Sequence, residues 1–287
     1  MFNYIVLSFF SKAFNIMSFS KANFFFMLSL LGVKNKKSLS KLFFKLKGNE
    51  FYSKITRTGV IQIYSNRELY LIPTIPSSSK SMAKNYKFWL ENNNKYSFLK
   101  YNMCSFSLNS IDYYSIEFMR PVANDFNLYD LKVSISTEEK NYSGIETEIE
   151  QAKNELNKLP NVDCETIKNF FEIKSYNGKV GFLHGDFHLG NIMMKEDKPM
   201  LIDLDRAKCF GPIDIDSIHF HLVDLQVKKK LFWLDELEIY FKCKKNSQLA
   251  KYSEDVVKLY LLYRVYFELN SKNKWLSNKL VKFINNI

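Results

Sequence analysis

Residues 184–205 decide the fold, and they read HGDFHLGNIMMKEDKPMLIDLD. Asp186 is followed five residues later by Asn191, and a run with the apolar–turn–apolar pattern of a β-hairpin then leads to Asp203. Phosphoryl transfer to a hydroxyl group needs one carboxylate to orient the acceptor, and an amide oxygen and a second carboxylate to hold Mg²⁺ against the nucleotide phosphates. We therefore predict Asp186 as the catalytic base, and Asn191 and Asp203 as the metal ligands. A hairpin without chemistry would explain the apolar runs but not the order of the polar residues.

The order of these residues resembles a known catalytic loop. Protein kinases have H-R-D-x-x-x-x-N followed by D-F-G, whereas here Gly185 replaces the arginine and residues 202–205 replace D-F-G. Over residues 181 to about 225 the chain resembles the aminoglycoside phosphotransferase and choline kinase family, whose signature is H-G-D-x-x-x-x-N followed by I-D. The resemblance implies an α+β, bilobed protein-kinase-like fold with a small β-rich N-lobe and a larger helical C-lobe. It also implies ATP as the phosphoryl donor and Mg²⁺ as the cofactor.

The same resemblance gives supporting roles to residues around the loop. The family has a Gly-Pro turn and then an aspartate that braces the catalytic loop from below, and here Gly211-Pro212 is followed by Asp214 and Asp216. Asp216 fits this role better, because apolar residues and a helix-like stretch, 217–225, follow it. We expect His184 to order the loop rather than to transfer protons.

Other residues of the C-lobe have interpretations of their own. Asp205 and Arg206 are predicted to form an internal ion pair, with a second metal ion as the alternative partner of Asp205. His219 and His221 lie two apart on an expected helix and so do not share a face, which argues against a zinc site. The segment from 253 through 267 is apolar nearly all round, as a buried helix is.

Residues 51–119 contain the strands and the helix expected of the small lobe. Residues 51–76 alternate enough to form strands, 82–90 are predicted to form the helix, and 98–108 and 113–119 are predicted to form two more strands. Residues 116–121 then resemble a kinase hinge, where we expect Glu117 and Met119 to meet the adenine of the nucleotide. An ordinary strand that ends at a proline is the alternative interpretation.

The small lobe also departs from the kinase pattern. It has no G-x-G-x-x-G, and residues 47–51 are the one candidate for a loop over the phosphates. Strand 69–74 lacks a lysine for the phosphates, so Lys80 or Lys84 would have to replace it, and we assign Lys80 to nucleotide binding. The glutamate that partners this lysine is missing from its expected place near Asn85. Glu91 lies about two turns later along the helix.

Composition bounds the class of protein and its compartment. The chain has 287 residues, 46% of them hydrophobic, which is enough for one bilobed unit or two small domains. Its four cysteines lie far apart with no C-x-x-C spacing, which is typical of reduced thiols in a cytoplasmic protein. We expect a basic, hydrophobic helical extension at 1–42, the N-lobe at 43–119 and the C-lobe at 120–287.

Positive charge is concentrated near the N-terminus. The net charge is +11, and residues 1–60 hold ten basic residues and one acidic residue. The uncharged runs 1–11 and 22–33 are shorter than the roughly 20 apolar residues that span a bilayer, and no signal-peptide pattern is present. Aromatic residues beside lysines are typical of a helix lying on an anionic membrane surface, and packing on the small lobe is the alternative. We expect a cytoplasmic protein, peripheral at the inner face of the membrane under the first interpretation. We expect no binding of nucleic acid, because no reader motif is present.

These features predict an ATP- and Mg²⁺-dependent phosphotransferase acting on a hydroxyl group of a small molecule. Residues 202–207 are similar to the I-D-x-x-R-A run of bacterial lipopolysaccharide-core sugar kinases, which favours a cell-envelope sugar or glycolipid as the acceptor. An aminoglycoside or choline-type acceptor is the alternative, although a chain of net charge +11 offers no excess of acidic residues to a cation. A pseudokinase scaffold at a membrane surface is a further alternative. The complete set Asp186, Asn191 and Asp203 argues against it.

Overall fold

The computed structural model describes two compact units of the chain. The residues that it describes are 18–19, 52–55, 60–64, 68–73, 76–108, 111–122, 138–142, 146–158, 165, 172, 176–270, 279 and 282–283. The N-terminal unit contains the described residues up to 122 together with 192–205, and the C-terminal unit contains those from 138 to 191 and from 206 to 283. The motif is therefore shared: Asp186 and Asn191 belong to the C-terminal unit, and Asp203 belongs to the N-terminal unit.

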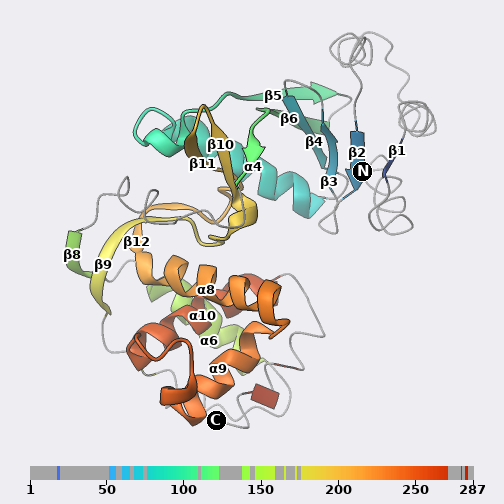
Figure 1. Ribbon diagram of the computed structural model, residues 1–287. Coiled ribbons are helices and arrows are strands. Elements are labelled where there is room, and N and C mark those ends of the chain that lie inside the picture. The colour runs from blue at the N-terminus through green and yellow to red at the C-terminus, as the bar shows by residue number, and fades with distance from the viewer. Residues whose placement is uncertain are drawn as a thin grey trace. The chain divides into compact units, whose positions relative to one another are not determined.

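An antiparallel sheet forms much of the described N-terminal unit (Figure 1). Its six strands lie in the order β1-β2-β3-β4-β6-β5. Their bounds are Ser18–Phe19 for β1, Tyr52–Ile55 for β2, Val60–Tyr64 for β3, Glu68–Pro73 for β4, Met103–Leu108 for β5 and Ile111–Glu117 for β6. β4 and β6 are adjacent inner strands, and both are buried over most of their length. Their buried positions hold aromatic and aliphatic side chains such as Tyr70, Leu71, Tyr114 and Ile116, which pack well on a pleated surface.

Helix α4, Pro76–Asn92, belongs to the same unit. Pro76 stands at its first position, where the missing backbone N–H costs no hydrogen bond. The buried residues follow at helical spacing and so form one face: Ser78, Met82, Asn85, Trp89 and Asn92. A 3₁₀ turn, η1 at Ser97–Leu99, leads from the helix to β5, and the Trp89 indole N–H donates to the Leu99 carbonyl at 3.1 Å.

The hairpin predicted after Asn191 consists of β10, Ile192–Lys195, and β11, Lys198–Leu201. Glu196 and Asp197 between them have positive φ angles of 48° and 61°, as a two-residue type I′ hairpin turn requires. β10 also pairs with β7, Arg120–Pro121, directly after the predicted hinge. The hairpin thus connects the predicted hinge with Asp203 inside one unit.

The C-terminal unit combines a small antiparallel sheet with helices. The strands are β8 at Glu138–Tyr142, β9 at Tyr176–Leu183 and β12 at Lys208–Pro212, in the order β12-β9-β8. The helices are α6 at Glu146–Asn157, α8 at Ile213–Lys229, α9 at Trp233–Lys242 and α10 at Glu254–Asn270, with short 3₁₀ turns η2 at Leu189–Asn191 and η3 at Lys244–Asn246. β9 runs directly into the motif, and β12 runs directly into α8.

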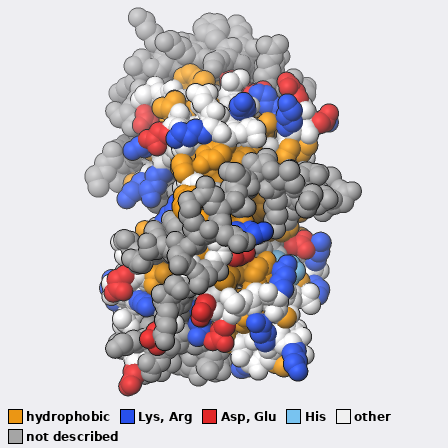
Figure 2. All heavy atoms as spheres, turned by 90° about the vertical axis from the view of Figure 1, so that its left-hand side faces the viewer, with side chains coloured by type: hydrophobic (Ala, Val, Ile, Leu, Met, Phe, Trp, Pro, Cys, Tyr) orange, Lys and Arg blue, Asp and Glu red, His pale blue; other side chains and the backbone are white. Residues whose placement is uncertain are grey.

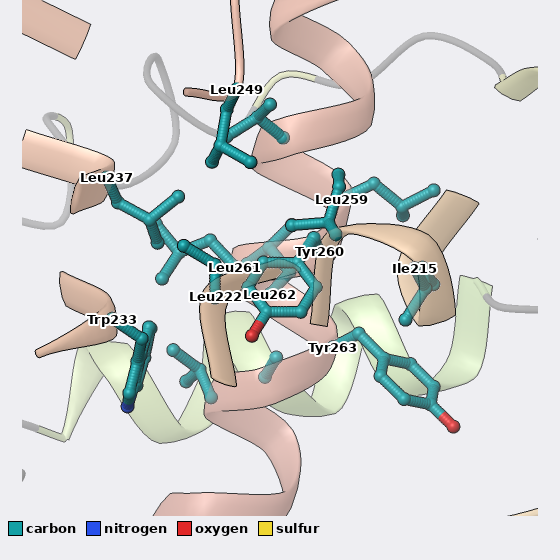
Figure 3. Close-up of a cluster of buried hydrophobic side chains, with 14 of the residues drawn as sticks. Ile215, Leu222, Trp233, Leu237, Leu249, Leu259, Tyr260, Leu261, Leu262 and Tyr263 are labelled. Carbon is teal, nitrogen blue, oxygen red and sulfur yellow. The ribbon is translucent and has the colours of Figure 1, made fainter. Parts of the chain in front are cut away.

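One hydrophobic core holds these helices together (Figure 3). The residues labelled there are Ile215 and Leu222 from α8, Trp233 and Leu237 from α9, Leu249, and Leu259, Tyr260, Leu261, Leu262 and Tyr263 from α10. A helix that buries five consecutive residues is covered on all sides, since consecutive side chains point around the whole helix. The prediction of a buried helix in the segment 253–267 is therefore confirmed.

The predicted α+β class is confirmed, with a β-rich N-terminal unit and a helical C-terminal unit. Some predicted elements were wrong in detail. The small-lobe helix begins at Pro76 rather than at residue 82, because the serines 77–79, predicted as a loop and a plausible helix start, form its first turn. Phe98 and Leu99 lie in a 3₁₀ turn rather than a strand. Gly211 and Pro212 end strand β12 instead of forming a turn, since Gly211 pairs with Gly181 of β9.

Several expectations lie outside the described residues. These are the interfacial helices of residues 1–42, apart from the two residues of β1, and the loop 47–51 over the phosphates. Among the helices that the structure describes, none is long and apolar enough to cross a membrane. On the face drawn in Figure 2, lysine and arginine side chains alternate with acidic ones rather than forming one continuous basic patch.

Candidate active site

The loop 184–191 is shaped by a glycine that tolerates no side chain. Gly185 has a φ of +80°, in the left-handed region that glycine alone adopts without strain. A Cβ placed there would lie 2.7 Å from the Tyr263 hydroxyl and 2.9 Å from Arg206 Cβ. Both neighbours belong to the same unit, so glycine at this position lets Arg206 and α10 approach the loop.

Asp216 holds the start of this loop through two backbone amides. The N–H of His184 donates to its Oδ2 at 2.6 Å, and the N–H of Gly185 donates to its Oδ1 at 2.8 Å. Burial raises the pKa of Asp216 to about 6, although electrostatic attraction from His184 and the two amide bonds act against the rise. Asp214 instead accepts a hydrogen bond from the Tyr176 hydroxyl at 2.7 Å. Asp216 therefore lies where the sequence analysis expected a loop-supporting carboxylate.

Only one of the two carboxylate oxygens of Asp186 contacts charged or polar side chains of the described residues. Three nitrogen atoms converge on its Oδ1: Arg264 Nη1 at 2.8 Å, His219 Nε2 at 2.9 Å and Arg206 Nη1 at 3.6 Å. Its Oδ2 makes no hydrogen bond or ion pair with any residue in the described part of the chain. A carboxylate fixed in this way can offer its second oxygen to an acceptor hydroxyl, which is what the predicted role requires.

The charges around Asp186 keep it ionised. Burial acts to raise the pKa of this carboxyl group, but the contact with His219 and the charges of Arg264 and Arg206 outweigh burial and hold the pKa well below its usual value. Burial lowers the pKa of His219 to about 4, so its imidazole is neutral at pH 7. Asp186 is thus an anion beside two guanidinium groups and a neutral imidazole.

The loop backbone is tied to two of its own histidines. His184 is fully buried, and its Nδ1 accepts the Asp186 N–H at 3.3 Å. His188 Nδ1 accepts the Gly190 N–H at 3.1 Å, and burial lowers the pKa of His188. These bonds support the expectation that His184 orders the loop.

Asn191 presents the atom that a metal ion would need. Its side-chain Nδ2 donates to the Asp186 carbonyl at 2.9 Å, and its backbone N–H donates to the His188 carbonyl. Because a carbonyl can only accept, the amino group must face it, and the Oδ1 of Asn191 faces the other way. An amide oxygen is a donor that Mg²⁺ prefers, so the orientation fits the predicted ligand role.

Asp203 stands in the N-terminal unit, directly after β11, with a left-handed φ of 63°. Non-glycine residues in this region cost free energy and gather at functional sites. The neighbouring backbone is held by α4: the Leu204 N–H donates to buried Asn85 Oδ1 at 3.1 Å, and the Ser81 hydroxyl donates to Asp205 Oδ2. Asp203 is exposed, and its carboxylate is a second donor that suits Mg²⁺.

The predicted ion pair between Asp205 and Arg206 was wrong. Asp205 accepts the hydroxyl of Ser81, and Arg206 lies against Asp186 and over the ring of Phe267. Adjacent side chains in a turn point in different directions. Asp205 therefore contacts α4, whereas Arg206 contacts the loop 184–191.

The nucleotide-binding residues predicted from sequence are placed as follows. Lys80 and Lys84 are both exposed on α4 and form no ion pair with a described residue. Glu117 is bonded to Lys195 Nζ at 2.8 Å, and its carboxylate also accepts the Asn102 N–H at 3.0 Å. Met119 is buried next to exposed Phe118. The nucleotide roles of Lys80, Glu117 and Met119 stay predictions.

Sequence reasoning missed the residues that hold Asp186 and the Asp203 segment. His219 follows Asp216 by three positions on α8, which puts both on one helix face, and this spacing could have indicated its role. Arg264 and Tyr260 are four apart on α10, about 80 residues beyond the motif, and no local pattern connects them with it. Asn85 stands where the glutamate was expected, but an amide there gives no charge pattern to recognise.

The loop and its supports on α8 fall inside a stretch that matches a known family. Residues 146–224 match the model of the Phosphotransferase enzyme family (APH). The matched stretch contains Asp186, Asn191, Asp203 and Asp216. The match agrees with the resemblance that the motif predicted.

Solved structures similar to this chain come from small-molecule kinases. An aminoglycoside-3'-phosphotransferase of type VIII is 13% identical, with 80% of this chain and 98% of that chain covered and a TM-score of 0.46. A ternary complex of APH(2")-IIa with streptomycin and ATP is 14% identical, with 86% and 90% covered and a TM-score of 0.47. A putative fructosamine-3-kinase from Haemophilus somnus 129PT is 13% identical, with 83% and 87% covered and a TM-score of 0.43. No curated protein matches the chain significantly in sequence.

Proposed function

We propose that this protein, whose residues 146–224 match the APH family, is an ATP- and Mg²⁺-dependent kinase that phosphorylates a hydroxyl group of a sugar-like small molecule. The observation that carries the proposal is the carboxylate of Asp186, with Oδ1 anchored by three nitrogen atoms and Oδ2 left for a ligand. In such an arrangement one oxygen of the carboxylate holds the side chain in place, and the other can orient a hydroxyl group.

The proposed reaction uses Asp186 chiefly to orient the acceptor. The acceptor hydroxyl donates to Oδ2, its oxygen attacks the γ-phosphorus of ATP, and the bond from that phosphorus to the ADP oxygen breaks. The proton passes to Asp186 as the new bond forms, because the low pKa of this carboxyl group makes it a weak base before then. Mg²⁺, when bound through Asn191 and Asp203, supplies charge neutralisation at the phosphates.

The charges beside Asp186 favour a neutral or acidic acceptor. Arg206 and Arg264 both lie within 3.6 Å of Oδ1, so an acceptor hydroxyl at Oδ2 would stand close to two guanidinium groups. An ammonium group next to that hydroxyl would be repelled, whereas a hydroxyl, carboxylate or phosphate would be attracted. This supports a cell-envelope sugar or glycolipid over an aminoglycoside or choline-type acceptor.

A panel of acceptors tests this function. The full chain is incubated with ATP and either Mg²⁺ or EDTA, and ADP release is measured with a neutral hexose, a sugar phosphate, a uronic acid, streptomycin and choline. We expect Mg²⁺-dependent ADP release that is fastest with a neutral or acidic sugar. Fastest turnover with streptomycin or choline would overturn the acceptor class.

The metal assignment has its own test. A ligand at 100 times its dissociation constant stabilises the protein by about 2.7 kcal/mol, so ATP with Mg²⁺ should raise the melting temperature. Asp203→Ala should abolish that rise, whereas Asp112→Ala, an exposed aspartate of β6, should keep it. A rise that survives in Asp203→Ala would contradict the ligand role.

A nucleotide-binding scaffold without catalysis is the second candidate function. The observation that favours it is that strand β4 carries no lysine for the phosphates, while Lys80 and Lys84 on α4 are both exposed and form no ion pair with a described residue. The panel separates the two functions: a scaffold would be stabilised by ATP but would release no ADP with any acceptor.

We also propose peripheral binding at the inner face of the membrane. Its support is the composition of residues 1–60, with ten basic residues among many aromatic and aliphatic ones. Lysines near an anionic surface contribute about 1 kcal/mol each, and salt screens this attraction. The full chain should float with anionic vesicles at low salt and partly dissociate at high salt. Equal flotation with neutral vesicles would contradict an electrostatic contribution.

A further inference from the structure

A line of polar groups connects the core of the C-terminal unit with Asp186. The Tyr260 hydroxyl lies 3.0 Å from His219 Nδ1, and His219 Nε2 lies 2.9 Å from Asp186 Oδ1. The ring of Tyr260 is 1% exposed and belongs to the hydrophobic core shown in Figure 3. The side chain of His219 is 5% exposed, so both groups are shielded from bulk solvent.

The direction of these hydrogen bonds follows from the chemistry of the end groups. An ionised carboxylate has no proton to donate, so a nitrogen 2.9 Å from Oδ1 must carry the proton itself to avoid lone-pair repulsion. Burial lowers the pKa of His219 to about 4, and a neutral imidazole carries one proton only. Nδ1 is then an acceptor, and the Tyr260 hydroxyl must donate to it. Tyr260 therefore selects the tautomer that bonds to Asp186.

Helix geometry explains why these groups meet. His219 lies three residues after Asp216 on α8, so the helix that braces the loop backbone also reaches the side chain of Asp186 one turn later. Arg264 lies four residues after Tyr260 on α10, so one face of that helix carries both the group that orients His219 and the guanidinium that bonds Oδ1 at 2.8 Å. The other charged or titratable groups near His219 are Asp186 and His188 of the loop.

The consequence for Asp186 is a fixed rotation of its carboxylate. With Oδ1 bonded to Arg264 and next to His219, the group cannot turn without losing a contact on that side. His219 Nε2 lies within ion-pair distance of Oδ1, but its N–H is not aligned well enough to form a regular hydrogen bond.

We infer that His219, held in one tautomer by Tyr260, is a positioning residue that together with Arg264 fixes Asp186 Oδ1, so that Oδ2 faces the acceptor hydroxyl. The inference rests on the proposed phosphotransfer for its functional meaning. The tautomer of His219 can be measured without any reaction.

Kinetics test the positioning role. The reaction is ADP release from ATP and Mg²⁺ with water as the acceptor, so that no identified sugar is needed. A misplaced catalytic group can cost about 100-fold, and we expect His219→Leu to lower kcat by about 10- to 100-fold with the KM for ATP unchanged. His219→Gln, which retains an N–H near the position of Nε2, should recover most of the loss. Tyr260→Phe should lower kcat by a smaller factor.

A matched control separates this effect from general damage to the core. Tyr240 is a second buried tyrosine of the same core, and its hydroxyl donates to the Tyr252 carbonyl. Tyr240→Phe should leave kcat unchanged. Equal losses in His219→Leu and His219→Gln, or a raised KM for ATP with kcat unchanged, would overturn the inference.

Nuclear magnetic resonance of ¹⁵N-labelled histidines gives a readout that does not depend on activity. At pH 7 His219 should be neutral with the proton on Nε2, and Tyr260→Phe should reduce the population of that tautomer. A cationic His219, or a proton on Nδ1, would overturn the inference even if the protein is an active kinase. Failure of the proposed function would be seen differently, as a wild-type chain that binds ATP and releases no ADP.

Discussion

The two segments that carry the motif are held by opposite kinds of contact. In the C-terminal unit, Asp186 is surrounded by two guanidinium groups and an imidazole. In the N-terminal unit, the backbone after Asp203 is held by the neutral side chains of Asn85 and Ser81. The difference teaches that Asp186 is positioned by charge, which also fixes its ionisation. The backbone after Asp203 is positioned by neutral hydrogen-bonding groups, and the exposed Asp203 carboxylate is the proposed metal ligand.

The largest expected effect removes the charge at the centre of the first segment. Asp186→Asn should keep the fold and the binding of ATP but lower turnover by about 10²- to 10⁴-fold, because the acceptor loses its orienting carboxylate and proton acceptor. The measurement is ADP release together with a melting curve. Asp197→Asn, an exposed aspartate at the tip of the hairpin, is the matched control and should be unaffected. Near-normal turnover in Asp186→Asn would contradict the catalytic role of Asp186.

The neutral anchor of the second segment should matter for stability. Asn85→Ala leaves the Leu204 N–H without its acceptor in a buried place, which should cost about 1 to 3 kcal/mol of unfolding free energy. It should also weaken the stabilisation by ATP and Mg²⁺, because Asp203 is next to Leu204. Urea unfolding measures the first effect, and thermal shift measures the second.

The control for that variant is the same substitution at an exposed site. Asn94→Ala, just beyond the end of α4, should change stability by less than about 0.5 kcal/mol. If the two variants behave alike, the Asn85 bond does not anchor the segment.

The pH dependence of stability tests whether His219, next to Asp186, is neutral in the folded chain. Burial lowers the pKa of His219 from 6.5 to about 4, so the unfolded chain binds a proton below pH 6.5 that the folded chain does not. This group therefore lowers stability as the pH falls from about 6.5 to about 4, by about 2 kcal/mol at pH 5. His219→Gln lacks this loss, so the wild type should lose about 2 kcal/mol more than the variant between pH 7 and pH 5.

The test is the difference in stability loss between the wild type and His219→Gln, because other groups also change the stability of each protein with pH. Asp216, with a pKa raised to about 6, takes up a proton in the folded state over the same range and stabilises both proteins as the pH falls. Urea unfolding at pH 7 and pH 5 gives the difference. Equal losses would mean that His219 is not held neutral.

The smallest expected effects concern the ion pairs of the hairpin. Lys195 and Glu117 are about a quarter exposed at a 2.8 Å separation, and Arg120 and Asp197 are mostly exposed at 3.4 Å. Surface pairs contribute about 0 to 1 kcal/mol, and we expect the first pair at the upper end and the second near zero. Double-mutant cycles measure both. A coupling of several kcal/mol would show that charge also holds the N-terminal unit, which would break the comparison.

Much of the catalytic loop could be predicted from sequence because its chemistry is local. Asp186 and Asn191 lie within one turn-rich stretch, and the hairpin that follows has a pattern of its own. Asp216 could be predicted from the apolar residues after it. Gly185 stands in the motif, but the reason for it, the approach of Tyr263 and Arg206, is visible only in space.

The order of the motif residues and the α+β class could be predicted from the sequence alone, because these depend on residue types at short spacing. Only the tertiary structure decided how Asp186 is held, since His219 and Arg264 reach it from helices that no local pattern connects with the loop. It also decided that Asn85 anchors the segment next to Asp203 where the sequence analysis expected a glutamate. A helix can be predicted because its apolar residues recur at a fixed spacing in the sequence. Which residues that helix contacts depends on tertiary packing, which leaves no local pattern.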